Sequence, residues 1–120
     1  ALLYGGSVDL IKEESCAKDG SYRGCFKVKG YVDVKILKEN QDPIFFGFEG
    51  KERFYASHCE EIKELPENFE VLAETSFSKN YAFKIKGRPH YGLQFHPELP
   101  ANNNKRSSRV ITNFMRYYVL

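Results

Sequence analysis

Cysteine is scarce in this chain of 120 residues, and the three cysteines follow no familiar pattern. Cys16, Cys25 and Cys59 are odd in number and lack the spacing of a disulfide framework. This favours free thiols in a reducing compartment. No two of them are separated by two residues, as a zinc ribbon would require. We therefore expect a cytoplasmic protein with neither structural disulfides nor a zinc ribbon.

Long apolar runs and an excess of one charge are also missing. No apolar run approaches the ~20 residues that a membrane helix needs, and no signal-peptide pattern is present. The formal net charge is only +2, so bulk electrostatics favours neither nucleic acid nor a membrane surface as a partner. We expect the protein to bind neither.

What the chain does contain is enough apolar material for one folded domain. Hydrophobic residues make up 42% of the sequence and aromatic residues 15%, which excludes a disordered chain. Local patterning predicts a strand-rich domain. The expected strands are 8–12, 26–29, 32–36, 53–57, 70–74, 81–86 and 90–95, the last two forming a hairpin.

Helices are predicted at only a few places. Residues 1–4 read as the end of a helix. Asp42 and Pro43 predict a single helical turn, with aspartate as its N-cap and proline at the first helical position. The charged residues after Cys59 predict a loop. At the C-terminal end, apolar residues at helical spacing predict an amphipathic helix, with Val110, Ile111, Phe114 and Tyr117 or Tyr118 on its apolar face.

The tripeptide His96-Pro97-Glu98, which follows the last expected strand, carries the clearest chemical signal. In an extended backbone, residues two positions apart point to the same side, so the Glu98 carboxylate can reach the His96 imidazole. Pro97 favours an extended conformation at His96. A histidine held by a carboxylate is the base and its orienting group in a nucleophilic triad. Taken alone, such a tripeptide at the end of a strand is usually just a turn.

A wider match turns this tripeptide into a family resemblance. Residues 92–98 read GLQFHPE, which resembles the G-[VL]-Q-F-H-P-E signature of class I (triad) glutamine amidotransferases. Residues 57–73 are similar to the family's S-H-x-D-x-V-x-x-L-P-x-G-F-x-V-L-A stretch. Residues 1–8 resemble the exit of the helix that follows the family's nucleophile. The nearest branch is the amidotransferase domain or subunit of GMP synthetase.

The resemblance implies a fold, and it implies which part of the family's domain this chain represents. Residues 1–120 would be the C-terminal part of one class I glutamine amidotransferase-like domain, an α/β domain of flavodoxin-like type. This part would be strand-rich and end in a helix. The family's nucleophilic cysteine lies in an elbow that precedes the matched region, so on this resemblance we expect the segment with that elbow to be absent from this sequence. We expect this chain alone to be inactive.

The resemblance also assigns roles to individual residues. His96 would be the general base for the cysteine thiol and then the general acid for the leaving ammonia. Glu98 would fix the histidine tautomer. Ser57, His58 and Cys59 would lie where the family's backbone cradles the glutamine substrate. Cys59 is not expected to be the nucleophile, because a nucleophile should lie on a strained strand-to-helix turn, whereas Cys59 precedes a charged stretch that is expected to be a loop.

Two other groups of residues have the chemistry of ligand sites. His58, His90 and His96 with Glu98 could be imagined around a metal ion, but their spacing is too long for close chelation, so we expect no metal. The basic residues 105–109 begin the C-terminal helix and could attract an anion. A solvated surface is the favoured reading of this cluster. In relatives, the neighbourhood of this basic cluster lies near the interface with the ammonia-accepting partner.

Three functions remain open at this point. The first is a glutamine amidotransferase that hydrolyses glutamine through a Cys-His-Glu triad and passes ammonia to a synthetase partner, without any cofactor. The second is a γ-glutamyl peptidase of the same fold. The third is a catalytically inactive, amidotransferase-like binding module. Glu60 in place of the family's aspartate, and the unusual residues 99–103, leave the ammonia acceptor open.

Overall fold

The computed structural model describes residues 6–10, 28–37, 42–48, 50–58, 60–99 and 105–119. Four predictions fall wholly or partly outside these residues: the helix end at 1–4, the last two residues of the strand at 8–12, the first two residues of the strand at 26–29, and the surroundings of all three cysteines. Within the described part of the chain, no helix is both long and apolar enough to cross a membrane.

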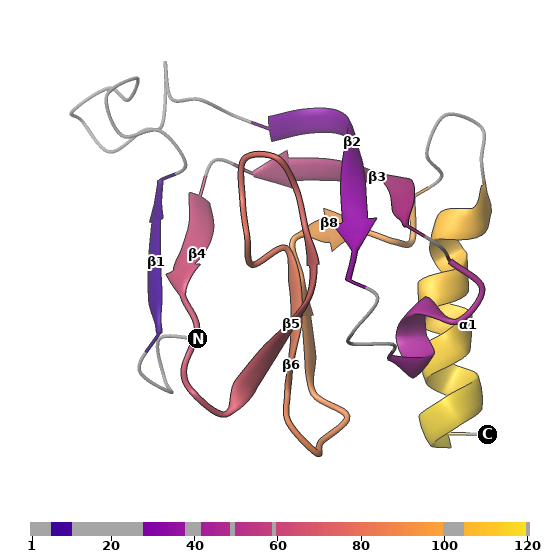
Figure 1. Cartoon of the computed structure of the whole chain (residues 1–120). Coiled ribbons are helices and arrows are strands. Elements are labelled where there is room, and N and C mark those ends of the chain that lie inside the picture. Colours follow the sequence, from indigo (N-terminus) through magenta and orange to yellow (C-terminus); the bar gives the residue numbers. More distant parts are fainter. Residues whose placement is uncertain are drawn as a thin grey trace.

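Strands dominate the described residues and form two antiparallel sheets (Figure 1). A small sheet pairs β1 with β4, and a six-stranded sheet has the order β7-β6-β5-β2-β3-β8. The strands are β1 (Ser7–Leu10), β2 (Val28–Ile36), β3 (Lys51–His58), β4 (Glu60–Glu64), β5 (Phe69–Glu74), β6 (Ala82–Ile85), β7 (Tyr91–Leu93) and β8 (Phe95–His96). The strand-rich α/β prediction is confirmed.

The six-stranded sheet is coiled so far that its two edges meet. β7 and β8 are the opposite edge strands, yet only Gln94 separates them along the chain. Two residues span at most about 7 Å, so the two edges lie next to each other. The predicted single strand at 90–95 is therefore wrong. It breaks at Gln94, whose backbone N–H donates to the carbonyl of Tyr81 at 3.0 Å.

Two further strand predictions need correction. The expected strands at 26–29 and 32–36 are one continuous strand, β2, which passes through Gly30 with φ of 118°. Glycine tolerates this conformation without a Cβ clash, so the strand bends there without ending. The expected loop after Cys59 is strand β4, because pairing with β1 satisfies its backbone.

Aromatic side chains fill the interior of the coiled sheet. Phe54 and Phe95 stack with ring centroids 4.1 Å apart, and Tyr81 lies against Phe95 at 6.1 Å. Phe54 and Tyr81 are fully buried. The same core also contains aliphatic side chains, including Val34, Ala56 and Leu72. Buried aromatic rings contribute much apolar area per residue, which suits a core built from few elements.

The predicted helical turn forms as the 3-10 helix η4 (Pro43–Phe45), with Asp42 as its cap. The backbone N–H of Ile44 donates to Asp42 Oδ1 at 3.1 Å. The same oxygen accepts from the Tyr91 hydroxyl at 2.6 Å, and Lys84 Nζ lies 2.6 Å from Oδ2. Asp42 is buried, so this one carboxylate joins η4 to β6 and β7.

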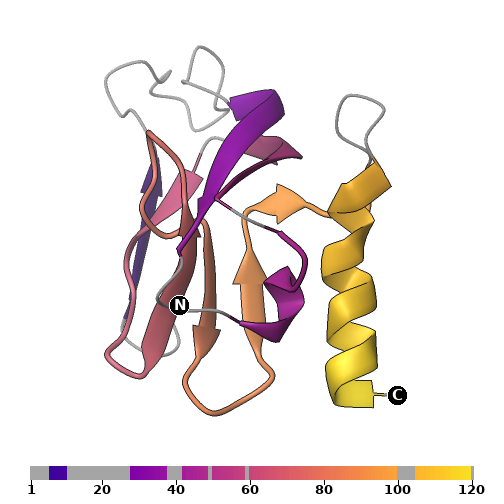
Figure 2. The same ribbon diagram turned by 45° about the vertical axis from the view of Figure 1, so that its right-hand side comes forward.

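The C-terminal helix also forms as predicted. It begins as η5 (Lys105–Ser108), continues as α1 (Arg109–Phe114) and ends as η6 (Met115–Val119). It packs beside η4, on the side of the molecule opposite to β1 and β4 (Figure 1, Figure 2). Asn113 Nδ2 donates to the carbonyls of Ile44 and Phe46, each at 2.9 Å.

The face of this helix differs from the predicted one. Val110 is buried and Phe114 packs against the core. Of the two tyrosines offered, Tyr118 lies on this face, with its ring 5.1 Å from Phe114. Ile111 does not, since it is 43% exposed. A polar residue, Asn113, occupies the buried stripe. Apolar spacing could not reveal this, because the asparagine is buried to satisfy the carbonyls of η4.

We expect Asp42→Ala to lower the free energy of unfolding by about 3–5 kcal/mol, because it leaves the mostly buried Lys84 ammonium without its closest partner. Asp33→Ala is the matched control, since Asp33 pairs with Arg53 at the surface, where such a pair contributes below about 1 kcal/mol. Urea unfolding of both variants measures the difference. An equal loss of unfolding free energy in Asp42→Ala and Asp33→Ala would contradict the structural role of Asp42.

Candidate active site

Strand β8 fixes the position of His96. Its first residue, Phe95, points into the core and stacks on Phe54. His96 therefore points to the opposite, outer face of the sheet. There it pairs in register with Tyr55 of β3, and the two rings lie 6.3 Å apart. The buried phenylalanine thus anchors a histidine whose own side chain is 44% exposed.

Glu98 contacts the His96 ring as predicted, but through a turn after β8 and not through the expected extended backbone. Glu98 Oε2 lies 3.0 Å from His96 Nδ1, and the backbone N–H of Leu99 closes the turn onto the His96 carbonyl at 3.2 Å. A backbone N–H hydrogen bond within Glu98 and the hydrogen bond from His96 hold the pKa of the Glu98 carboxyl below its ordinary value. An ionised carboxylate only accepts hydrogen bonds. The proton of a neutral His96 therefore lies on Nδ1, and Nε2 presents its lone pair.

Ser57 lies on the same outer face as His96. In β3, Tyr55 and Ser57 are two positions apart and share one face of the strand. Since His96 pairs with Tyr55, Ser57 is its diagonal neighbour across the two strands. Tyr31 of β2 pairs with Tyr55 on the other side, with ring centroids 5.8 Å apart. The structure thus brings Ser57 and His96 together on an open face.

His58 points the other way, into the interior. Its Nδ1 lies 2.8 Å from the Glu60 carbonyl, so Nδ1 carries the proton. The Tyr81 hydroxyl lies 2.6 Å from Nε2 and donates to it. Burial lowers the pKa of His58 below its ordinary value of 6.5, and the hydrogen bond to Glu60 opposes this only in part. Both ring nitrogens are occupied, so the imidazole itself cannot hold a substrate.

Tyr81 is the residue of this region that sequence reasoning missed. Its hydroxyl holds His58, while its backbone carbonyl accepts from Gln94 at the break before β8. Burial raises the pKa of Tyr81, so the hydroxyl stays protonated and remains a donor. In the sequence it is only the first residue of an expected strand. No local signal distinguishes it from other core tyrosines.

Three further candidates from the sequence are Cys59, a metal site and the basic cluster at 105–109. Cys59 lies outside the described residues, so its predicted place beside the substrate stays a prediction. The described residues contain no group of three side chains that could hold a metal ion. In the basic cluster, Arg106 is already engaged, donating to the Gly47 carbonyl at 2.9 Å and to Glu52 Oε1 at 3.1 Å.

Comparison with known sequences gives consistent matches over nearly the whole chain. The family model described as glutamine amidotransferase class-I matches residues 4–116. The glutamine-hydrolyzing GMP synthase subunit of Methanothermobacter thermautotrophicus is 36% identical over 114 residues, covering 95% of this chain and 52% of that protein. The corresponding subunit of Methanocaldococcus jannaschii is 34% identical, covering 97% and 53%. The chain therefore spans about half the length of these relatives.

Solved structures give the same answer for the fold. A GMP synthase-type protein from Thermoplasma acidophilum matches with a TM-score of 0.74 and 27% identity, covering 97% of this chain and 50% of that one. A glutamine amidotransferase from Thermotoga maritima matches with a TM-score of 0.60 and 20% identity, covering 98% and 40%. The second likeness concerns the fold alone. Together these matches bear out the fold that the resemblance implied.

The lowered pKa of His58 predicts a pH dependence of stability. Below pH 6.5 the unfolded chain binds a proton at His58 that the folded protein does not, because the folded pKa is lower. The free energy of unfolding should therefore fall as the pH drops through 6.5, and level off below the folded pKa. Urea unfolding across this range, on the parent and on His58→Gln, tests it. If the free energy of unfolding fell equally steeply with pH in both proteins, His58 would not be the group responsible.

Proposed function

The chain belongs to the class I glutamine amidotransferase family, and we propose that it supplies the base half of a glutaminase active site. The nucleophilic cysteine would come from the part of the relatives' length that this chain does not match. The chain alone would then be inactive, and residues 1–120 would form the C-terminal part of a single catalytic domain.

One observation carries this proposal. His96 Nδ1 is held by Glu98 at 3.0 Å, while the imidazole remains partly open to solvent on the outer face of β8. A base that must reach a thiol from another segment needs this arrangement: one nitrogen oriented, the other accessible. A purely structural histidine would have both nitrogens occupied, as His58 has.

The proposed chemistry follows from the free Nε2. It takes the proton of the cysteine thiol, and the thiolate attacks the side-chain carboxamide carbon of glutamine. As the tetrahedral intermediate collapses, the C–N bond breaks and Nε2 returns the proton to the leaving ammonia. Water then hydrolyses the thioester, with His96 again as base, and glutamate leaves. Glu98 stabilises the imidazolium that forms in each half of the cycle.

Ser57, His58 and Cys59 are proposed to cradle glutamine through their backbone. The end of β3 lies beside His96 because β3 and β8 pair at Tyr55. His58 supports this role indirectly. Hydrogen bonds to the Tyr81 hydroxyl and the Glu60 carbonyl hold its ring in the interior, and this fixes the end of β3. A rigid strand end can hold a substrate through main-chain groups even where the side chains are turned away.

The proposed partner is an ammonia-accepting synthetase, as in GMP synthases. The relatives named as glutamine-hydrolyzing GMP synthase subunits support this choice. The reaction needs no cofactor, and we propose a cytoplasmic location, with no role for nucleic acid or membranes. The γ-glutamyl peptidase and the inactive binding module have no observation of their own in their favour, and a glutaminase assay separates them from the proposal.

The decisive variant is His96→Asn, made in the complete protein that contains this chain and assayed with its synthetase partner. We expect glutamate release from glutamine to fall by at least about 10³-fold, and Glu98→Gln to reduce it at least about tenfold. Both side chains are exposed, so the melting temperature should not change. Unaltered activity in His96→Asn would refute the role of the base. Turnover of γ-glutamyl peptides but not of glutamine would identify the peptidase.

Cys59→Ser tests the assignment of the nucleophile. If Cys59 only contributes backbone to the substrate cradle, glutaminase activity of the complete protein should stay within about threefold, because main-chain groups are unchanged. A nucleophile would behave differently, since its replacement costs several orders of magnitude. Steady-state glutamate release measures the difference. A loss comparable to that of His96→Asn would place the nucleophile in this chain and overturn the proposal.

A further inference from the structure

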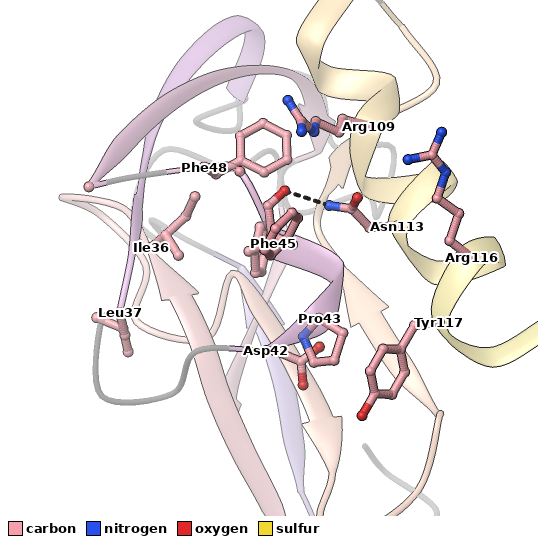
Figure 3. A pocket seen from close by; sticks show the side chains of 13 residues that line it. Ile36, Leu37, Asp42, Pro43, Phe45, Phe48, Arg109, Asn113, Arg116 and Tyr117 are labelled. Carbon is pink, nitrogen blue, oxygen red and sulfur yellow. Dashed lines mark hydrogen bonds between the residues drawn. The ribbon is translucent and has the colours of Figure 1, made fainter.

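Two pockets in the described part of the chain lie outside the candidate active site, and their buried polar groups differ. The larger lies between η4 and the C-terminal helix, with Arg109 and Arg116 on its helix wall (Figure 3). Both oxygens of its buried Asp42 are taken, one by the cap of η4 and one by Lys84. Asn113 is hydrogen-bonded to η4 as well. The buried polar groups of this groove therefore need no ligand.

The second pocket, with a volume of about 420 Å³, lies between β4 and the turn that joins β5 to β6. Small-molecule sites typically measure about 300–1,000 Å³. Glu61 and Ser78 line this pocket, and both are buried, with exposed fractions of 8% and 4%. Glu61 pairs with Lys63 through Oε1. Its Oε2 and the Ser78 hydroxyl have no hydrogen-bond partner in the described part of the chain.

Two such atoms in one pocket are unusual. Buried polar atoms in folded proteins nearly always have a partner, because leaving one unpaired lowers stability. Here a carboxylate oxygen and a hydroxyl from two different segments line the same pocket. A ligand that donates hydrogen bonds to both would supply the missing partners.

The walls of this pocket are held in place by the chain itself. The Thr75 N–H donates to the Ser78 carbonyl at 2.7 Å, and the Ser78 N–H donates back to Thr75 Oγ1 at 3.0 Å. Asn80 Nδ2 donates to the Ile62 carbonyl at 2.8 Å, which ties the turn to β4. The groups of Glu61 and Ser78 are therefore positioned before a ligand arrives, which reduces the entropy lost on binding.

The charges of the lining indicate the class of ligand. Two carboxylates and two ammonium groups line the pocket, those of Glu61, Glu74, Lys63 and Lys79. The described lining thus carries no net charge, which favours a ligand that carries none. A cationic N–H is the strongest donor to a carboxylate oxygen, and an ammonium group has further donors for a hydroxyl. The exposed Lys79 can receive an anionic group at the opening.

We propose that this pocket binds a zwitterionic α-amino acid. Its ammonium group donates to Glu61 Oε2 and to the Ser78 hydroxyl, and its carboxylate faces Lys79. This ligand is not the glutamine of the proposed reaction, because neither His96 nor Ser57 lines the pocket.

Occupation of the pocket is expected to reach the end of β3 through charge. Burial lowers the pKa of His58, and the negative charge of Glu61 is among the influences that oppose this. An ammonium group bound at Glu61 offsets that charge. The pKa of His58 should therefore fall further when the pocket is filled, which gives a second readout of binding.

The test is a titration of the complete protein that contains this chain with L-alanine, followed by ¹H–¹⁵N correlation spectra at constant ionic strength. We expect saturable shifts of the amide signals of residues 61–63 and 75–80, with a Kd of about 0.1–3 mM, and a lower pKa of His58 at saturation. Sodium propionate lacks the ammonium group and isopropylammonium chloride lacks the carboxylate. Each should bind at least about tenfold more weakly than alanine.

Variants separate the two ends of the ligand. Glu61→Gln should weaken alanine binding at least about tenfold, because it removes the charge that the ammonium group meets. Lys79→Gln should weaken alanine binding at least about threefold and should not weaken that of isopropylammonium. Glu67→Gln and Lys86→Gln, exposed residues outside the pocket, are the matched controls and should bind as the parent does.

Three results would overturn the proposal. The first is no saturable shift up to about 100 mM alanine, which would mean that water satisfies the two buried atoms. The second is equal affinity for alanine and isopropylammonium, which would make the pocket a plain cation site. The third is a set of shifts confined to Tyr55 and His96 with an unchanged pKa of His58, which would place alanine at the candidate active site. No glutaminase activity is measured, so the result is independent of the function proposed for His96.

Discussion

The hydrogen bonds of Tyr81 are the constraint on which the rest of this structure depends. Its backbone N–H donates to Ala73 of β5, its carbonyl accepts from Gln94, and its hydroxyl donates to His58 at the end of β3. One buried residue thus ties together the strands on both sides of the coiled sheet and the point at which its edges meet. Because the chain turns at Gln94 from β7 into β8, this contact places Phe95 in the core and His96 on the outer face.

Local signals in the sequence predicted the parts of the fold that local chemistry decides. The cap at Asp42, the C-terminal helix and the His96–Glu98 turn depend on residues within a few positions of one another. The continuity of β2 through Gly30, the pairing of β4 with β1 and the break at Gln94 depend on contacts between segments far apart in the sequence. Alternation of apolar residues could not predict them, since it is the same in a continuous strand and in a broken one.

The same distinction applies to the candidate site. The contact between His96 and Glu98 was predictable from their spacing, although it forms in a turn closed by the Leu99 N–H and not in the expected extended segment. The orientation of His58 was not predictable, because adjacent residues of a strand face opposite sides and the register of β3 is set by β2 and β8. Ser57 and His58, neighbours with one expected role, therefore face opposite sides of β3. Ser57 lies beside the base, whereas the His58 ring supports the strand from within.

The central claim is that this chain holds a histidine ready to act as a base through Nε2. The most direct measurement is the tautomer of His96, read from the ¹⁵N chemical shifts of its ring at alkaline pH. The account predicts a proton on Nδ1 and a free lone pair on Nε2, with this preference lost in Glu98→Gln. A dominant Nε2-protonated form, or identical shifts in the parent and the variant, would contradict it.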